Sequence, residues 1–131
     1  MRITEYNWRF PGLIFRLPAL LIMAALWILS SRDTLPKMEG IPGLDKILHF
    51  IAYAALAAAS GLWFSKESWL RQSRRNFLIS AAVASVYGIV DEFHQYFVPG
   101  RTSDIGDWIA DTLGGMAGAA VILLVVRTRK I

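Results

Sequence analysis

The stretch from Tyr87 to Gly118 constrains this chain most, because it places many ionisable side chains between two apolar runs. It contains five carboxylates, one imidazole, one amide and one guanidinium. The flanking runs, Phe77 to Val90 and Met116 to Val126, have the composition of membrane helices. Ionisable groups at membrane depth cost free energy, so they persist where they pair, line wet cavities or take part in function. A solvated loop would explain the middle of the stretch, but not Asp91 or Asp111, which continue the helical runs.

Composition places the chain among membrane proteins. Its 131 residues suffice for one domain, and 55% of them are hydrophobic and gathered in blocks. The net charge is +4, but the basic residues lie in short segments between apolar runs. That arrangement indicates membrane orientation rather than nucleic-acid binding. The absence of cysteine excludes disulfides, thiolate metal sites and a cysteine nucleophile. We therefore expect residues 1–131 to form a single membrane domain.

The apolar blocks predict an all-α fold, a polytopic bundle of four transmembrane helices. The expected spans cover residues 13–31, 46–64, 77–97 and 104–126. We expect Pro18 in the first turn of the first helix and Asp45 as the cap of the second. Residues 65–76 are predicted to be a short basic loop. The tryptophans that we expect in the interfacial belt are Trp63, Trp69 and Trp108.

The distribution of Lys and Arg predicts the orientation of the bundle. Ten of these residues lie in the N-terminal segment, the middle loop and the tail, against four in the other two loops. Because basic residues accumulate on the cytoplasmic side, both termini should be cytoplasmic. The Asp45 end of the second span, the Gln95 end of the third and the Asp107 end of the fourth then lie together. Topology thus gathers the polar side chains into one extracytoplasmic cluster.

Helical spacing puts these polar side chains on single faces. The second span carries Asp45, His49, Tyr53 and Leu56 on one face. The third carries Tyr87, Asp91 and Gln95, with Glu92 alongside. The fourth carries Asp104, Asp107, Asp111, Gly114 and Gly118. The two glycines form a small-x-x-x-small surface, which we expect to pack against the Ala-rich second helix.

We expect Asp91, Glu92, Asp107 and Asp111 to converge at the outer ends of the third and fourth helices. Such a group of like charges must be neutralised, by Arg101, Lys46 and His49, by protonation, or by a bound divalent cation such as magnesium, manganese or zinc. Asp104 suits a helix cap better than a catalytic role. For Asp45 and His49 two interpretations stay open. One is a cap with an orienting hydrogen bond, and the other is an acid/base pair or a set of metal ligands.

Three motifs in order resemble the VanZ-like family of small bacterial membrane proteins. The first motif is Asp45, Lys46, His49 and Tyr53. The second is Asp91, Glu92, Gln95, Phe97, Pro99, Gly100 and Arg101. The third is Asp107, Asp111, Gly114 and Gly118. The family often has Asn where this chain has Asp111, and the difference adds a potential charge. The resemblance implies a multi-pass protein of the bacterial inner membrane that acts at the cell surface.

Three functions compete. The first is an enzyme acting on a phosphorylated or glycosylated envelope lipid, or on a lipid-linked cell-wall precursor. Its catalytic candidates are His49, Asp91, Glu92 and Asp107, and its substrate-binding candidates are Arg101, Gln95, Tyr53 and Lys46. The metal candidates are Asp91, Glu92, Asp107 and Asp111. The second function is a non-enzymatic envelope factor, like the family member linked to teicoplanin resistance. The third, an ion-coupled transporter, fits less well because the polar cluster sits at one membrane face.

Overall fold

The computed structural model describes residues 12–32 and 40–129, and all regular elements within them are helical. The elements are η1 (Leu13–Phe15), α1 (Leu17–Ser30), α2 (Leu44–Gly61), α3 (Lys66–Arg71), α4 (Ser73–Tyr96) and α5 (Ile105–Thr128). The all-α prediction is confirmed. Four basic residues that entered the orientation argument lie outside the described residues, namely Arg2, Arg9, Lys37 and Lys130.

Three of the described segments are long and apolar enough to cross a membrane, namely Leu13–Ser30, α4 and α5. The protein is therefore a multi-pass membrane protein by helix composition. Helix α2 is not among these segments. Its first two turns carry Asp45, Lys46 and His49, and these polar side chains lower its hydropathy.

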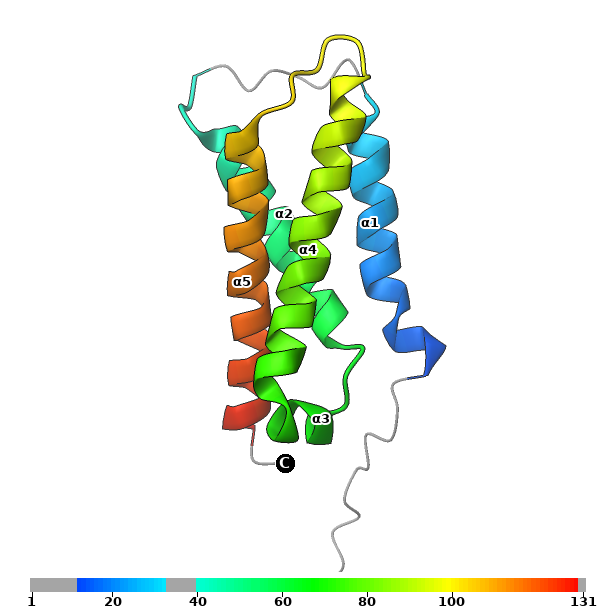
Figure 1. Cartoon of the computed structure of the whole chain (residues 1–131), viewed down its shortest axis with the longest axis vertical. Helices are drawn as coiled ribbons and strands as arrows, with labels where there is room; N and C mark the ends of the chain where they lie inside the picture. The colour runs from blue at the N-terminus through cyan, green and yellow to red at the C-terminus, as the bar shows by residue number, and fades with distance from the viewer. Residues whose placement is uncertain (1–11, 33–39, 130–131) are drawn as a thin grey trace, which may run out of the picture.

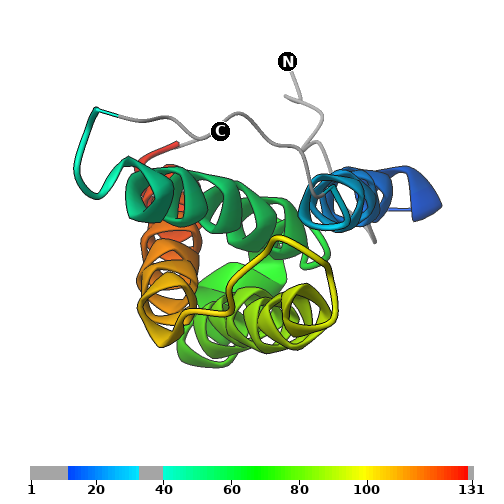
Figure 2. The same cartoon turned by 90° about the horizontal axis from the view of Figure 1, so that it is seen from above.

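The four long helices run side by side, and α3 lies at one end of the bundle (Figure 1). Seen from above, α2, α4 and α5 form a compact trio, with α1 standing to one side against α2 and α4 (Figure 2). The amino end of α2, the carboxyl end of α4 and the amino end of α5 share the end opposite α3. Three polar helix ends therefore meet, as the sequence predicts.

Small side chains make up much of the interior of the bundle, together with the large buried side chains of Tyr53, Leu56 and Trp69, while many large apolar side chains face outward. Ala57, Ala84 and Ala119 are fully buried, whereas Val86 and Leu124 are about 60% exposed (59% and 60%). Helices with small contact residues approach closely in lipid, where apolar side chains remain in a favourable environment outside the protein.

The glycines of α5 make the closest helix contact. A Cβ atom at Gly114 would lie 2.2 Å from the Phe50 carbonyl oxygen, and one at Gly118 would lie 2.0 Å from that of Ala54. Both separations are too short for any side chain, so the backbones of α5 and α2 touch directly. The prediction that these glycines pack against the second helix is confirmed.

Several local expectations need correction. The predicted loop 65–76 contains α3, and α4 begins at Ser73 rather than Phe77. Ser65 nucleates α3 by accepting a hydrogen bond from the Ser68 N–H at 3.1 Å. Trp69 is buried instead of interfacial, because its indole N–H donates to the Gly61 carbonyl at 2.9 Å. Helix α2 begins at Leu44, and the residue that caps it is Gly43, whose φ of 77° suits glycine. Asp45 therefore lies in the first turn and is not the cap. Pro18 does lie in the first turn of α1.

Candidate functional site

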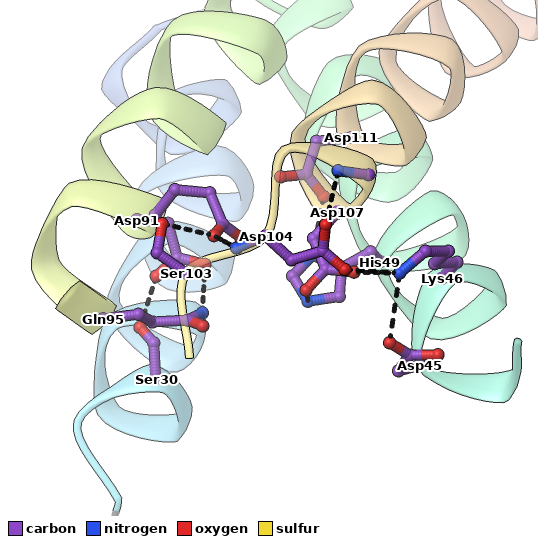
Figure 3. Close-up of polar contacts among 12 residues, drawn as sticks. Ser30, Asp45, Lys46, His49, Asp91, Gln95, Ser103, Asp104, Asp107 and Asp111 are labelled. Atoms are coloured by element: carbon purple, nitrogen blue, oxygen red, sulfur yellow. Dashed lines mark hydrogen bonds and ion pairs between the residues drawn. The ribbon is translucent and has the colours of Figure 1, made fainter. Parts of the chain in front are cut away.

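The polar cluster forms where α2, α4 and α5 meet, and most of its members are labelled in Figure 3. Lys46, His49 and Tyr53 come from α2, and Asp91, Glu92 and Gln95 come from α4. Asp107 and Asp111 come from the first turns of α5. Eight of the nine predicted site residues are therefore brought to one end of the bundle. The ninth, Arg101, lies in the α4–α5 loop.

Lys46 binds three carboxylates at the mouth of the site. Its Nζ lies 2.8 Å from Asp104 Oδ2, 3.1 Å from Asp107 Oδ1 and 3.4 Å from Asp45 Oδ2. Asp104 also caps α5, since its Oδ1 accepts the Gly106 N–H at 2.8 Å, which confirms the predicted cap. The Lys46 ammonium and that N–H hold the pKa of the Asp104 carboxyl below its usual value.

His49 lies one turn deeper, between two carboxylates of α5. Its Nδ1 is 2.8 Å from Asp111 Oδ1, and its Nε2 is 3.7 Å from Asp107 Oδ2. The Asp111 side chain is fully buried. Space for it comes from Gly88 on α4, where a Cβ atom would lie only 2.7 Å from Asp111 Oδ2. The imidazole is thus held by one carboxylate at hydrogen-bond distance and faces a second.

Glu92 joins α4 to the loop that leads into α5. Its Oε2 accepts the Asp104 N–H at 2.8 Å and the Ser103 hydroxyl at 3.1 Å. Its Oε1 is buried. Within the described residues, neither this oxygen nor Asp111 Oδ2 has a hydrogen-bond partner. Buried polar atoms are satisfied in the great majority of cases, so two orphaned carboxylate oxygens in one cluster call for an explanation.

Asp91 is satisfied by its neighbours. Its Oδ1 accepts a short hydrogen bond from the Ser30 hydroxyl of α1, and its Oδ2 accepts from Tyr53 at 3.0 Å and Gln95 at 3.3 Å. Figure 3 shows Asp91, Gln95 and Ser30 together, apart from His49 and Lys46. These contacts tie α1, α2 and α4 to one carboxylate. They account for Asp91, Tyr53 and Gln95 without a ligand.

Arg101 does not neutralise the carboxylates, contrary to expectation. Its Nη2 donates to the Leu29 carbonyl oxygen at 3.1 Å, at the carboxyl end of α1. Carbonyl oxygens at a helix end lack intrahelical partners and attract cations, which explains this contact. No ion pair joins Arg101 to an acidic side chain of residues 12–32 or 40–129. Within the described part of the chain, Lys46 is the Lys or Arg side chain that pairs with the cluster.

An open groove between α4 and α5 leads to the cluster. It has a volume of about 310 Å³, and its lining is Ile89, Glu92, Phe93, Ser103, Asp104, Ile105 and Trp108. A second hollow of about 160 Å³ adjoins it at Trp108 and continues along Ile109, Thr112 and Leu113. The Trp108 indole lies between the helices and donates to the Ser85 carbonyl at 3.1 Å. The groove therefore has acidic side chains at one end and apolar walls along its length.

Comparison with known proteins identifies the family. The model of the VanZ/LLP1 family matches residues 3–126, which is nearly the whole chain. The chain belongs to the VanZ/LLP1 family. No curated protein and no solved structure matches it. The resemblance predicted from three motifs is therefore confirmed, and the match extends beyond those motifs to the first helix and the middle segment.

In this VanZ/LLP1 protein the motif residues divide into two groups with different surroundings. Asp91, Tyr53 and Gln95 bind one another and α1. Glu92 and Asp111 each keep one oxygen without a hydrogen-bond partner among the described residues, and His49 lies against Asp111. Three contributing residues escaped sequence reasoning: Ser30, Gly88 and Ser103. Ser103 stands directly before the predicted cap, which is a local signal for a role at the loop. Ser30 and Gly88 sit in apolar runs and gain their roles only through helix packing.

Proposed function

We propose that this VanZ/LLP1 protein is an enzyme of the bacterial inner membrane that acts on an envelope lipid with a phosphorylated or glycosylated head. The observation that carries the proposal is the groove between α4 and α5. It brings exposed apolar side chains, Phe93 (67% exposed) and Ile105 (74%), next to the buried Glu92 carboxylate. An amphiphile could lay its hydrocarbon chain along the apolar wall and bring its head to the carboxylates.

The cluster contains the groups that hydrolysis or transfer at a lipid head requires. His49, oriented by Asp111, would move a proton to or from the reacting oxygen. Glu92 lines the groove, and its buried Oε1, which has no hydrogen-bond partner among the described residues, would accept a proton from water or from the attacking hydroxyl. Asp107 faces the other ring nitrogen of His49 and would stabilise the imidazole in its working orientation. The tautomer of His49 determines which ring nitrogen accepts or donates the proton.

The remaining predicted residues would support this chemistry. Lys46, whose side chain is 43% exposed, would meet an anionic head while it holds its three carboxylates together. Asp91, Tyr53 and Gln95 would keep the helices at fixed distances, so that His49 and Glu92 stay aligned. Arg101 would hold the loop above the site through its contact with α1.

The proposal includes four spans with both termini in the cytoplasm and the cluster on the outer side. Helix α2 lies against α5 at two backbone contacts, Phe50 with Gly114 and Ala54 with Gly118, so it shares the depth of an apolar helix. The basic segment around α3 and the carboxyl end of α5 lie at the same end, where Lys66 Nζ donates to the Arg129 carbonyl at 3.2 Å. This arrangement supports a cytoplasmic location for that end.

The test is turnover by purified protein reconstituted in vesicles made from bacterial envelope lipids. Mass spectrometry of the extracted lipids should reveal a species consumed by the wild type and spared by His49→Gln and Glu92→Gln. Asp45→Asn is the matched control, because Asp45 is an exposed carboxylate at the rim of the same cluster. It should retain most of the activity. Lipid profiles of a deletion strain would point to the substrate class.

The alternatives predict different results. A non-enzymatic envelope factor would retain a lipid through purification without converting it, and His49→Gln would not change the lipids recovered. A proton- or ion-coupled transporter needs ionisable groups across the membrane. The side chains that α4 buries below Asp91 carry no ionisable group, and they are Ala84, Ala81, Ser80 and Asn76. If the wild type converts no lipid in the full mixture but still binds one, the enzyme hypothesis is rejected in favour of the lipid-binding factor.

A further inference from the structure

We infer that His49, Glu92 and Asp111 form a binding site for one divalent cation. One ligand atom from each residue lies within 4.8 Å of the other two. The set differs from the one predicted from sequence, because His49 replaces Asp91 and Asp107. The inference deepens the proposed function and rests on it for its catalytic meaning. With a cation bound, His49 and Glu92 would act as its ligands instead of transferring protons, and the cation would supply the activation of water. Binding itself is measured without any lipid.

The unpaired oxygens are the independent observation that points to a ligand. Asp111 is fully buried and Glu92 is 93% buried, since 7% of its surface remains exposed. Each keeps one carboxylate oxygen without a hydrogen-bond partner among the described residues. A buried carboxylate needs a cation, a proton or several donors. A cation between the two carboxylates and the imidazole would satisfy both orphaned oxygens at once.

A second acidic group in the same region does not need a metal. Asp45, Asp104 and Asp107 also bring ligand atoms within 4.8 Å of one another. However, the Lys46 ammonium already contacts all three carboxylates, at 2.8 to 3.4 Å. The Lys46 ammonium thus occupies the position that a metal ion would take among these three carboxylates. Lys46 is engaged there, and among the described residues no ion pair joins a Lys or Arg side chain to Glu92 or Asp111.

The geometry suits a site with one nitrogen and two oxygen ligands. Adjacent ligands at about 2.1 Å from a metal ion stand about 3 Å apart, and the three ligand atoms lie within 4.8 Å of one another, so a small movement would bring them around one ion. The ion would replace the 2.8 Å hydrogen bond between His49 Nδ1 and Asp111 Oδ1. Asp107 Oδ2 lies 3.7 Å from Nε2, the other ring nitrogen of His49. A small movement would let it accept the hydrogen bond that a metal-bound imidazole usually donates to a carboxylate. Zinc and manganese suit this ligand set best, and magnesium accepts it less readily. Glu92 lines the groove, so an open coordination position would face the substrate.

The experiment measures metal binding by the full chain in detergent. Protein stripped with a chelator and dialysed is titrated with Zn²⁺ and with Mn²⁺ by calorimetry, and retained metal is measured by elemental analysis. We expect about one ion per chain in the wild type. His49→Gln and Asp111→Asn should bind at least about 100-fold more weakly. Asp107→Asn should bind about 10–100-fold more weakly, because it loses a carboxylate that orients the ligating imidazole. Asp45→Asn should bind like the wild type.

Two further measurements guard against variants that misfold. Gly88→Ala leaves every ligand in place but adds a Cβ atom 2.7 Å from Asp111 Oδ2, so metal affinity should fall while His49 remains. Cobalt absorption or manganese spin resonance should report a nitrogen ligand in the wild type and lose it in His49→Gln. Failure of the wild type to bind either metal overturns the site, as does equal binding by the wild type and His49→Gln. Lipid turnover that persists in the chelator would then leave the proposed enzyme as an acid/base network without metal.

Discussion

The contact between α2 and α5 offers the sharpest test of the fold, because its cost follows from two distances. Cβ contacts in real proteins do not fall below 3.0 Å, yet a Cβ atom at Gly114 would lie 2.2 Å from a backbone oxygen of α2. At Gly118 the distance would be 2.0 Å. In Gly114→Ala, α5 must therefore retreat from α2 by about 0.8 Å, and in Gly118→Ala by about 1.0 Å. Backbone atoms cannot rotate away as a flexible side chain would.

Overpacking of this kind destabilises a protein by about 1–3 kcal/mol. The higher helix propensity of Ala than of Gly offsets at most about 1 kcal/mol of this loss. Because both clashes are with backbone atoms, the upper part of the overpacking range applies, about 2–3 kcal/mol, so each single variant should lose about 1–2 kcal/mol of unfolding free energy. One displacement of α5 relieves both clashes, so the double variant should lose less than the sum of the two single losses. Leu113→Ala is the control on the same helix, since Leu113 is exposed, and it should change stability by less than about 0.5 kcal/mol.

The assay is equilibrium unfolding in mixed detergent micelles, followed by tryptophan fluorescence. Displacement of α5 should also move Asp111 away from His49, so metal affinity and lipid turnover should fall in proportion to stability. If Gly114→Ala and Gly118→Ala unfold like the wild type, the two glycines face detergent and the packing of α2 on α5 is refuted.

Two further predictions concern topology and the α1 attachment. The chain has no native cysteine, so single cysteines at Ile41 and Thr102 should react with an impermeant maleimide from outside intact cells, and one at Ser73 should not. The opposite labelling pattern would reverse the orientation and place the cluster in the cytoplasm. Asp91→Asn removes a charged acceptor that holds Ser30 and Tyr53, so it should cost about 1.5–3 kcal/mol and loosen α1, seen as faster proteolysis between α1 and α2. If Asp91→Asn keeps its stability but loses activity, Asp91 acts in catalysis rather than in holding α1.

The sequence by itself determined the class of the protein and the place of its cluster. Blocked apolar runs predict membrane helices, and helical spacing puts Asp107 and Asp111 on the same face as the two glycines. The order of the spans then brings three polar helix ends together. These inferences hold because hydropathy and periodicity are local properties that survive in any packing of the helices. The Asp104 cap is equally local, since a helix start needs an acceptor whatever surrounds it.

Only the tertiary structure decided which acidic side chain meets which partner. Periodicity gives a residue its face and its depth, but the partner depends on how far each helix is rotated and shifted against its neighbours. A change of one turn would exchange Asp107 for Asp111 beside His49. The packing sends Arg101 to the end of α1, gives Lys46 to the outer carboxylates and leaves Glu92 and Asp111 with unpaired oxygens. The candidate metal site follows from that choice of partners, because the cation-binding capacity of a carboxylate depends on what else already binds it.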